Sequence, residues 1–207
     1  MGSRALAAPL LIAAGLAALG SGCGGSESGS RTGGTSTAAS HPPAATVTHP
    51  SGIDPLEGAG TGPVSGGAEG TAIALLSRVA VARHEGYDRV VFGFRNALPG
   101  YRVEYVKPPL YEDGSGDPVD VAGSAVVAVR MEPSSGFDAE TGGGEIVYEG
   151  PRRISGSQAG TSTVREVVRT GDFEAVLSWA VGLGDHVEFR VLTLEKPPRL
   201  VVDFRNH

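Results

Sequence analysis

Cysteine and histidine, the residues most often found in catalytic and metal sites, are scarce in this chain. The only cysteine among its 207 residues is Cys23, so the remainder has no thiol for catalysis or for a thiolate zinc site. His84, His186 and His207 show no metal-binding spacing such as His-Glu-x-x-His, and the first two adjoin turn residues, which favours exposed positions. The sequence therefore predicts no catalytic residue, metal or cofactor, and a protein that is not an enzyme.

Positive charge is also in short supply. The formal net charge is -6, and residues 71–207 hold 15 Lys and Arg against 19 Asp and Glu. A nucleic-acid-binding protein needs basic side chains to neutralise phosphates. This balance excludes nucleic-acid binding as a function.

No apolar run is long enough to cross a membrane. The longest, residues 5–19 (ALAAPLLIAAGLAAL), follows Arg4 and has the length and charge of a signal peptide, which we place at residues 1–22. Cys23 comes next and resembles the acylated cysteine of bacterial lipoproteins, whose acyl chains hold a protein to the membrane at about 0.8 kcal/mol per buried methylene. We therefore expect an exported lipoprotein on the outer face of the cell membrane. The alternative is cleavage near Gly22 by the ordinary signal peptidase, which leaves a secreted protein.

Apolar periodicity is missing from residues 24–70, which consist mainly of Gly, Ser, Thr, Pro and Ala. Such a segment cannot bury enough surface to offset its chain entropy. We expect residues 23–70 to form a disordered tether behind Cys23, followed by one domain at residues 71–207. A flexible tether of about 47 residues reaches some 35–40 Å on average.

Alternation of apolar and polar residues dominates residues 71–207 and indicates β-strands. In residues 173–181 (FEAVLSWAV), every second residue shares one apolar face that includes Trp179. Further candidate strands lie at residues 72–83, 88–95, 101–107, 125–131, 145–149, 164–170, 187–194 and 199–205. Only residues 134–143 favour a helical turn. Short strands between Gly, Pro and Asp clusters predict an all-β fold, an antiparallel β-sandwich.

Two segments about a hundred residues apart are closely similar, with five identical residues in nine. Residues 88–96 read DRVVFGFRN and residues 198–206 read PRLVVDFRN. Each places large apolar residues at alternate positions and ends in Arg-Asn. We expect two equivalent strands related by internal pseudo-symmetry, one in each sheet. The alternative is a chance similarity between valine-rich strands.

The polar ends of this repeat are the candidate ligand-binding residues: Arg95 with Asn96, and Arg205 with Asn206. Arginine binds carboxylates through two parallel hydrogen bonds, and the stem peptides of peptidoglycan carry carboxylates. Tyr101 is a candidate for stacking on a sugar ring, whereas the alternation around Trp179 favours burial in the core. The alternative for both Arg-Asn pairs is simple solvation of strand ends.

Two charged stretches invite a binding role but favour exposed loops. Residues 111–123 (YEDGSGDPVDVAG) carry Asp113, Asp117 and Asp120, which are oxygen ligands suited to Ca²⁺. The stretch lacks the ligand spacing of an EF-hand, and its glycines favour a solvated hairpin loop. Residues 150–156 (GPRRISG) contain an arginine pair that could face an anionic polymer or simply water.

Four segments together resemble a known family: YDRVVFGFRNALPGYRVEYV (87–106), GSAVVAVRM (123–131), VREVVRTGDFEAVLSWAVGL (164–183) and PPRLVVDFRN (197–206). They are similar to the AMIN-like domain of actinobacterial lipoproteins and, more remotely, to the AMIN domain of bacterial cell-envelope proteins. The resemblance implies a two-sheet β-sandwich with internal symmetry. It also implies a role in localising proteins in the envelope, beside an amidase or a secretin, and in binding peptidoglycan.

From the resemblance and the residues together we expect a non-enzymatic cell-envelope module, a lipid-anchored domain for peptidoglycan binding or localisation. The alternative is a protein-interaction subunit that supports a separate cell-wall hydrolase or transport complex. The expected partners are the membrane, through the lipid anchor, and either peptidoglycan or an envelope protein.

Overall fold

The computed structural model describes residues 54–68, 70–140 and 142–207, which belong to one compact unit, Thr48–His207. The expected signal peptide, Cys23 and the tether up to residue 53 lie outside the described residues. Within the described part of the chain, no helix has the length and apolar character needed to cross a membrane.

Every regular element in the described residues is a β-strand, which confirms the all-β prediction. The strands are β1 (Val64–Gly66), β2 (Ala74–His84), β3 (Tyr87–Phe94), β4 (Gly100–Val106), β5 (Leu110–Tyr111), β6 (Pro118–Val119), β7 (Ala125–Glu132), β8 (Ser134–Ser135), β9 (Phe137–Asp138), β10 (Glu145–Ile146), β11 (Arg153–Ser155), β12 (Val164–Phe173), β13 (Val176–Leu183), β14 (Phe189–Glu195) and β15 (Pro198–Arg205). The helical turn expected in residues 134–143 is wrong, since this stretch contains β8 and β9.

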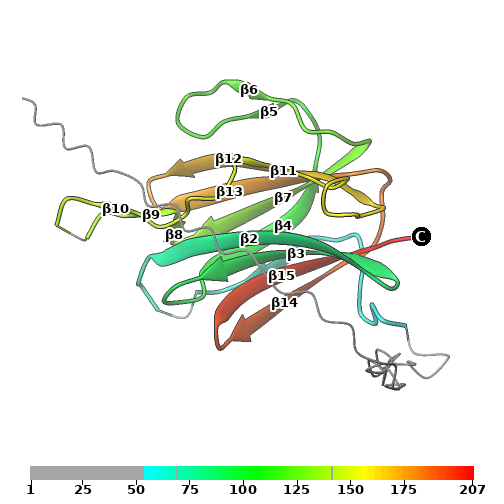
Figure 1. Ribbon diagram of the computed structural model, residues 1–207, viewed down its shortest axis with the longest axis horizontal. Helices are drawn as coiled ribbons and strands as arrows, with labels where there is room; N and C mark the ends of the chain where they lie inside the picture. The colour runs from blue at the N-terminus through cyan, green and yellow to red at the C-terminus, as the bar shows by residue number, and fades with distance from the viewer. Residues whose placement is uncertain (1–53, 69, 141) are drawn as a thin grey trace, which may run out of the picture. The chain divides into compact units, whose positions relative to one another are not determined.

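The strands form two large sheets (Figure 1). The first has six strands in the order β1-β4-β7-β13-β12-β11, and the second has five in the order β14-β15-β3-β2-β8. All neighbours are antiparallel except β2 and β8. Two small hairpins, β5–β6 and β9–β10, stand apart from the large sheets.

The core lies between the two sheets and is built from alternate residues of their strands. Its centre is Trp179 of β13, which is 1% exposed and lies 5.8 Å from the Phe92 ring of β3 and 5.6 Å from the Tyr148 ring. Both contacts are edge-to-face, an arrangement that aromatic rings prefer. The prediction that Trp179 is a core residue is confirmed.

The two copies of the repeat, β3 and β15, are neighbours in the same sheet. Val91 pairs with Val201, and the strands run antiparallel along their whole length. The expectation of one copy in each sheet is therefore wrong. The order β14-β15-β3-β2 instead places the hairpins β2–β3 and β14–β15 symmetrically about the β3–β15 pairing. An alternating pattern decides which side chains face the core, but it is equally compatible with either sheet.

The folded unit begins before residue 71, where the sequence places the end of the tether. Val64 pairs with Val103 to add β1 to the six-stranded sheet, and Leu56 is 1% exposed. Tyr101 packs its half-buried ring over Gly66, where a side chain would collide with it. A three-residue strand of sequence VSG has too few apolar positions to be recognised by its periodicity.

Candidate functional site

The structure places the two Arg-Asn pairs at opposite ends of the five-stranded sheet. Because β3 and β15 are antiparallel, Gly93 near the end of β3 pairs with Arg199 at the start of β15, and Tyr87 pairs with Arg205. Arg95 and Arg205 therefore belong to two separate regions.

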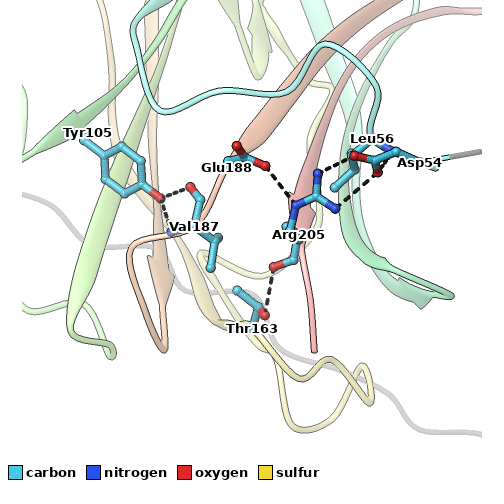
Figure 2. Close-up of polar contacts among 7 residues, drawn as sticks. All are labelled: Asp54, Leu56, Tyr105, Thr163, Val187, Glu188 and Arg205. Carbon is cyan, nitrogen blue, oxygen red and sulfur yellow. Dashed lines mark hydrogen bonds and ion pairs between the residues drawn. The ribbon is translucent and has the colours of Figure 1, made fainter.

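At one end, Arg205 joins three parts of the chain (Figure 2). Its guanidinium donates two hydrogen bonds to the Asp54 carboxylate, at 3.2 and 2.8 Å, and a third to Glu188 at 2.9 Å. Its carbonyl oxygen accepts a hydrogen bond from the Thr163 hydroxyl at 3.1 Å. The hydrogen bond from Arg205 lowers the pKa of Asp54, helped by the bond from the Leu56 N–H. We call Asp54, Glu188 and Arg205 the C-terminal clasp.

Asn206 is equally committed to internal contacts. Its side-chain amide donates to the His84 carbonyl at 3.1 Å and to the buried Asp88 carboxylate at 2.8 Å. The other oxygen of Asp88 accepts the backbone N–H groups of Ser162, Thr163 and Val164 at 3.0, 2.6 and 3.0 Å. Asp88 thus ties β3 of one sheet to the start of β12 in the other.

Tyr105 holds the segment that crosses from β13 to β14 at this same end (Figure 2). Its hydroxyl accepts the Val187 N–H at 3.0 Å and donates to the Val187 carbonyl at 2.6 Å. Burial raises the pKa of Tyr105. The exposed His186 stacks on the Tyr105 ring, with centroids 3.9 Å apart. The region around Arg205 and Asn206 therefore serves to join the two sheets.

Replacing Arg205 by alanine is expected to loosen the chain around Asp54 without unfolding the domain, because exposed ion pairs contribute little to global stability. Hydrogen exchange of the Leu56 and Gly60 amides should become faster, while that of Val91 in β3 stays unchanged. Since the pKa of Asp54 is lowered in the folded protein, the stabilisation by its charged form is present above the unfolded pKa and is lost as the pH falls through the folded pKa. Lowering the pH should therefore also loosen the chain around Asp54 in the wild type. Unchanged exchange at Leu56 and Gly60 would contradict the clasp, and Arg83→Ala is the charge-matched control.

The other end of the sheet carries a groove beside Arg95. Asn96 lines it and is fixed in place: its oxygen accepts the Leu75 N–H and its amide donates to the Ile73 carbonyl, both at 2.9 Å. The groove measures about 390 Å³, and its other walls are residues 71–73, Leu75 and residues 137–140. It lies between the chain that enters β2 and the β9–β10 hairpin.

Arg95 stands near this groove with its side chain 47% exposed. It donates two hydrogen bonds to Glu145 of β10, at 3.1 and 2.9 Å. These hydrogen bonds, which Arg95 donates and the Glu145 carboxylate accepts, raise the pKa of Arg95 and lower the pKa of Glu145. The sequence pointed to Arg95 and Asn96 but missed residues 137–140, where the only signal is one phenylalanine in a run of small and acidic residues.

The acidic stretch forms the hairpin loop predicted for it, whereas the loop prediction for the arginine pair is wrong at Arg153, which begins β11 and pairs with β12. Residues 110–119 make the β5–β6 hairpin, and the Asp113 N–H donates to the Thr170 carbonyl at 2.9 Å. Arg152 pairs with Glu112 and Arg153 with Glu166. Within the described ranges, no three His, Cys, Asp or Glu side chains gather in a way that could hold a metal ion.

Comparison with known protein families places most of the described residues. The family model described as AMIN-like domain matches residues 74–206, which span β2 to the end of β15. No curated protein and no solved structure matches the chain.

Proposed function

The chain belongs to the AMIN-like domain family and is a module of the cell envelope, and from this premise we propose that it is a lipid-anchored, non-catalytic domain that binds peptidoglycan at the groove beside Arg95. The observation that carries the proposal is the groove itself. Its walls include the hydrogen-bonding side chain of Asn96 and the partly exposed ring of Phe137, and Arg95, whose side chain is 47% exposed, stands next to Asn96.

The chemistry of the groove suits a polymer with sugar rings and free carboxylates. The Arg95–Glu145 pair is open to water, so its strength is modest and a carboxylate of the ligand can compete for the guanidinium. The groove also adjoins Phe137, whose ring is 45% exposed and can stack on an apolar sugar face. Arg205 and Asn206 are occupied by internal contacts, so binding is proposed at Arg95 and Asn96 alone.

The N-terminal chain enters the domain at a place distant from the groove. Asp54 is bound to Arg205, at the end of the five-stranded sheet opposite the groove. The entry of the chain therefore does not obstruct the groove.

Co-sedimentation with purified peptidoglycan tests the proposal. Protein lacking residues 1–22, with Cys23→Ser to prevent acylation, is expected to pellet saturably and to be displaced by soluble muropeptides. Arg95→Ala should raise the apparent Kd about tenfold, since a hydrogen bond to a charged group is worth about 1.5–3 kcal/mol. Arg83→Ala, which removes an exposed arginine outside the groove, should bind like the wild type. Protein that stays in the supernatant would rule out wall binding.

The lipid anchor at Cys23 has its own test. Radiolabelled palmitate is expected to label the full-length protein in the producing cell and to be absent from Cys23→Ala. The label should follow the membrane fraction, because two or more acyl chains anchor a protein stably. Absence of label from the wild type would leave a secreted protein.

A further inference from the structure

The face of the five-stranded sheet that points away from the core, its outer face, holds one carboxylate between two arginines. Asp203 of β15 is the cross-strand partner of Arg190 in β14 and of Arg89 in β3. Its fully buried carboxylate accepts hydrogen bonds from both guanidinium groups, at 2.7 Å from Arg89 and 3.0 Å from Arg190. We call these three residues the Asp203 cluster.

The repeat of β3 and β15 produces the same arrangement a second time, without the carboxylate. Figure 1 shows β2, β3, β15 and β14 side by side, with one hairpin on each side of the β3–β15 pairing. Gly93 and Asp203 both stand sixth in the repeated segments that begin at residues 88 and 198. Gly93 is the cross-strand partner of Arg78 in β2 and of Arg199 in β15. Two arginines thus flank a position that carries a carboxylate in the first copy and no side chain in the second.

Both arginines lie on the same face as a side chain at position 93 would. A Cβ atom placed on Gly93 would lie 3.7 Å from the Arg78 Cβ atom. Arg199 precedes the fully buried core residue Leu200, so the alternation of β15 turns Arg199 away from the core. Directly opposed residues of antiparallel strands have Cβ atoms about 4.5–5.5 Å apart, which brings Arg199 beside Gly93 as well.

The fold itself does not require a glycine at position 93. Its backbone does not adopt a positive φ, and the nearest atoms to an added Cβ lie 3.7 Å away, at an ordinary van der Waals distance. Glycine within a strand weakens it and often marks a place where a ligand approaches closely. Binding therefore accounts for Gly93 better than folding does.

The two arginines beside Gly93 have no counterion in the described part of the chain. Arg78 forms no ion pair there, and Arg199 donates one long hydrogen bond, 3.4 Å, to the Pro197 carbonyl. Among the side chains that β2, β3, β14 and β15 place on the outer face, the only carboxylate is Asp203, which its own cluster already binds. Arg78 and Arg199 therefore keep their capacity to bind an anion.

Other charges near this pair do not replace a ligand. Arg95, two residues beyond Gly93, is paired with Glu145. Glu195 ends β14 and alternates onto the other face of the sheet, and Lys196 adds a further positive charge in the next turn. The region is thus positive in a chain whose net charge is -6.

We propose that Arg78, Gly93 and Arg199 form a binding site for the carboxylate of a peptide, which takes the position that the Asp203 side chain fills in the first copy. The Gly93 site, as we call these three residues, uses the bidentate recognition by which arginine binds carboxylates. The fold already holds a carboxylate at the equivalent position, which favours this anion over a phosphate. The site is separate from the groove and does not depend on peptidoglycan binding there.

Apolar residues beside the site favour a peptide as the carrier of the carboxylate. Leu194, the cross-strand partner of Arg199, is 40% exposed. Successive cross-strand partners form an apolar row across the sheet, next to the site: Ala80, Val91, Val201 and Leu192. Aliphatic side chains that precede a terminal carboxylate can cover this row, which removes apolar surface from water.

Titration followed by NMR tests the Gly93 site. Protein lacking residues 1–22, with Cys23→Ser, is titrated at low salt with N-acetyl-alanyl-alanine, which carries one free carboxylate. The Gly93 amide and the side-chain Nε resonances of Arg78 and Arg199 are expected to shift saturably, with a Kd on the order of 1 mM. The C-terminal amide of the same dipeptide has no charge and should leave these resonances in place.

Substitutions separate this site from other arginines. Arg78→Ala and Arg199→Ala are each expected to raise the Kd for the dipeptide about tenfold, because each removes a charge-assisted hydrogen bond. Arg83→Ala, which removes an exposed arginine from the other face of β2, should titrate like the wild type. Arg95→Ala should also titrate like the wild type, although it is expected to weaken pelleting with peptidoglycan, so the two proposals can fail separately.

Gly93→Asp supplies the carboxylate from the chain itself. The added carboxylate should bind Arg78 and Arg199, so Tm should rise about 2–4 °C above that of Gly93→Ala, which adds a Cβ atom without charge. The dipeptide should no longer bind to Gly93→Asp and should still bind to Gly93→Ala. Combining Gly93→Asp with Arg78→Ala and Arg199→Ala should abolish the gain in Tm.

The same titration identifies the source of the carboxylate. Soluble muropeptide that shifts the Gly93 amide would assign it to peptidoglycan, whereas a response to the dipeptide alone would assign it to the end of a protein chain. The proposal would be overturned by equal shifts with the acid and the amide or by no shift with either. A Kd unchanged in Arg78→Ala and Arg199→Ala, tighter binding of inorganic phosphate, or full dipeptide binding to Gly93→Asp would overturn it as well.

Discussion

Asp88→Ala is expected to lower the free energy of unfolding by about 3–5 kcal/mol, because several buried hydrogen-bond donors lose their acceptor at once and each unpaired group costs about 1–3 kcal/mol. Asp88 is fully buried and accepts three backbone N–H groups at the start of β12 and the side-chain amide of Asn206. These contacts join the two sheets, so their loss affects the whole domain. Urea unfolding followed by Trp179 fluorescence measures the change.

Two further variants show whether this carboxylate acts as described. Asp185→Ala, at an exposed aspartate, should stay within about 0.5 kcal/mol of the wild type. Asp88→Ala combined with Asn206→Ala should cost less than the sum of the single changes, because the two side chains share a hydrogen bond. A loss below about 1 kcal/mol in Asp88→Ala would show that the backbone donors find other partners.

The second large effect is expected at Asp203, which is fully buried between two arginines of neighbouring strands. Arg89 of β3 binds both carboxylate oxygens, at 2.7 and 2.9 Å, and Arg190 of β14 binds one of them at 3.0 Å. The hydrogen bonds that Arg89 donates to the Asp203 carboxylate raise the pKa of Arg89. Asp203→Ala leaves two partly buried guanidinium groups facing each other, and we expect a loss of about 3–5 kcal/mol.

Replacing all three charged residues should lower the stability of the domain far less than replacing Asp203 alone. In Arg89→Met, Asp203→Leu, Arg190→Met, no charge is left without a partner, and apolar side chains of similar size replace a buried ion cluster at little or no cost. Thermal unfolding of the single and triple variants measures both. If Asp203→Ala melted at the wild-type temperature, the two arginines would have to be solvated well enough to need no counterion.

The candidate site was partly visible in the sequence. Arg95 and Asn96 follow the last residue of an alternating strand, so their position at one end of a sheet follows from β3 alone. Arg205 and Asn206 have the same local pattern, yet their side chains are bound to other parts of the domain and do not face the groove. The difference lies in their neighbours. Asp54 binds Arg205 and Asp88 binds Asn206, and both carboxylates come from distant parts of the sequence. The ion pair with Glu145, by contrast, leaves Arg95 half exposed.

The sequence by itself determined that residues 71–207 are rich in strands, which side chains of β3 and β15 face the core, and that Trp179 is buried. These properties follow from alternation with period two, which is a local property of each strand. The single strand expected at residues 173–181 is wrong, since the exposed Phe173 ends β12 and β13 begins at Val176.

Only the tertiary structure decided that β3 and β15 are neighbours, that residues before 71 belong to the domain, and that Asp54 and Asp88 bind Arg205 and Asn206. Such facts depend on which strands pair, and pairing is set by contacts between residues far apart in the chain, which no local pattern encodes.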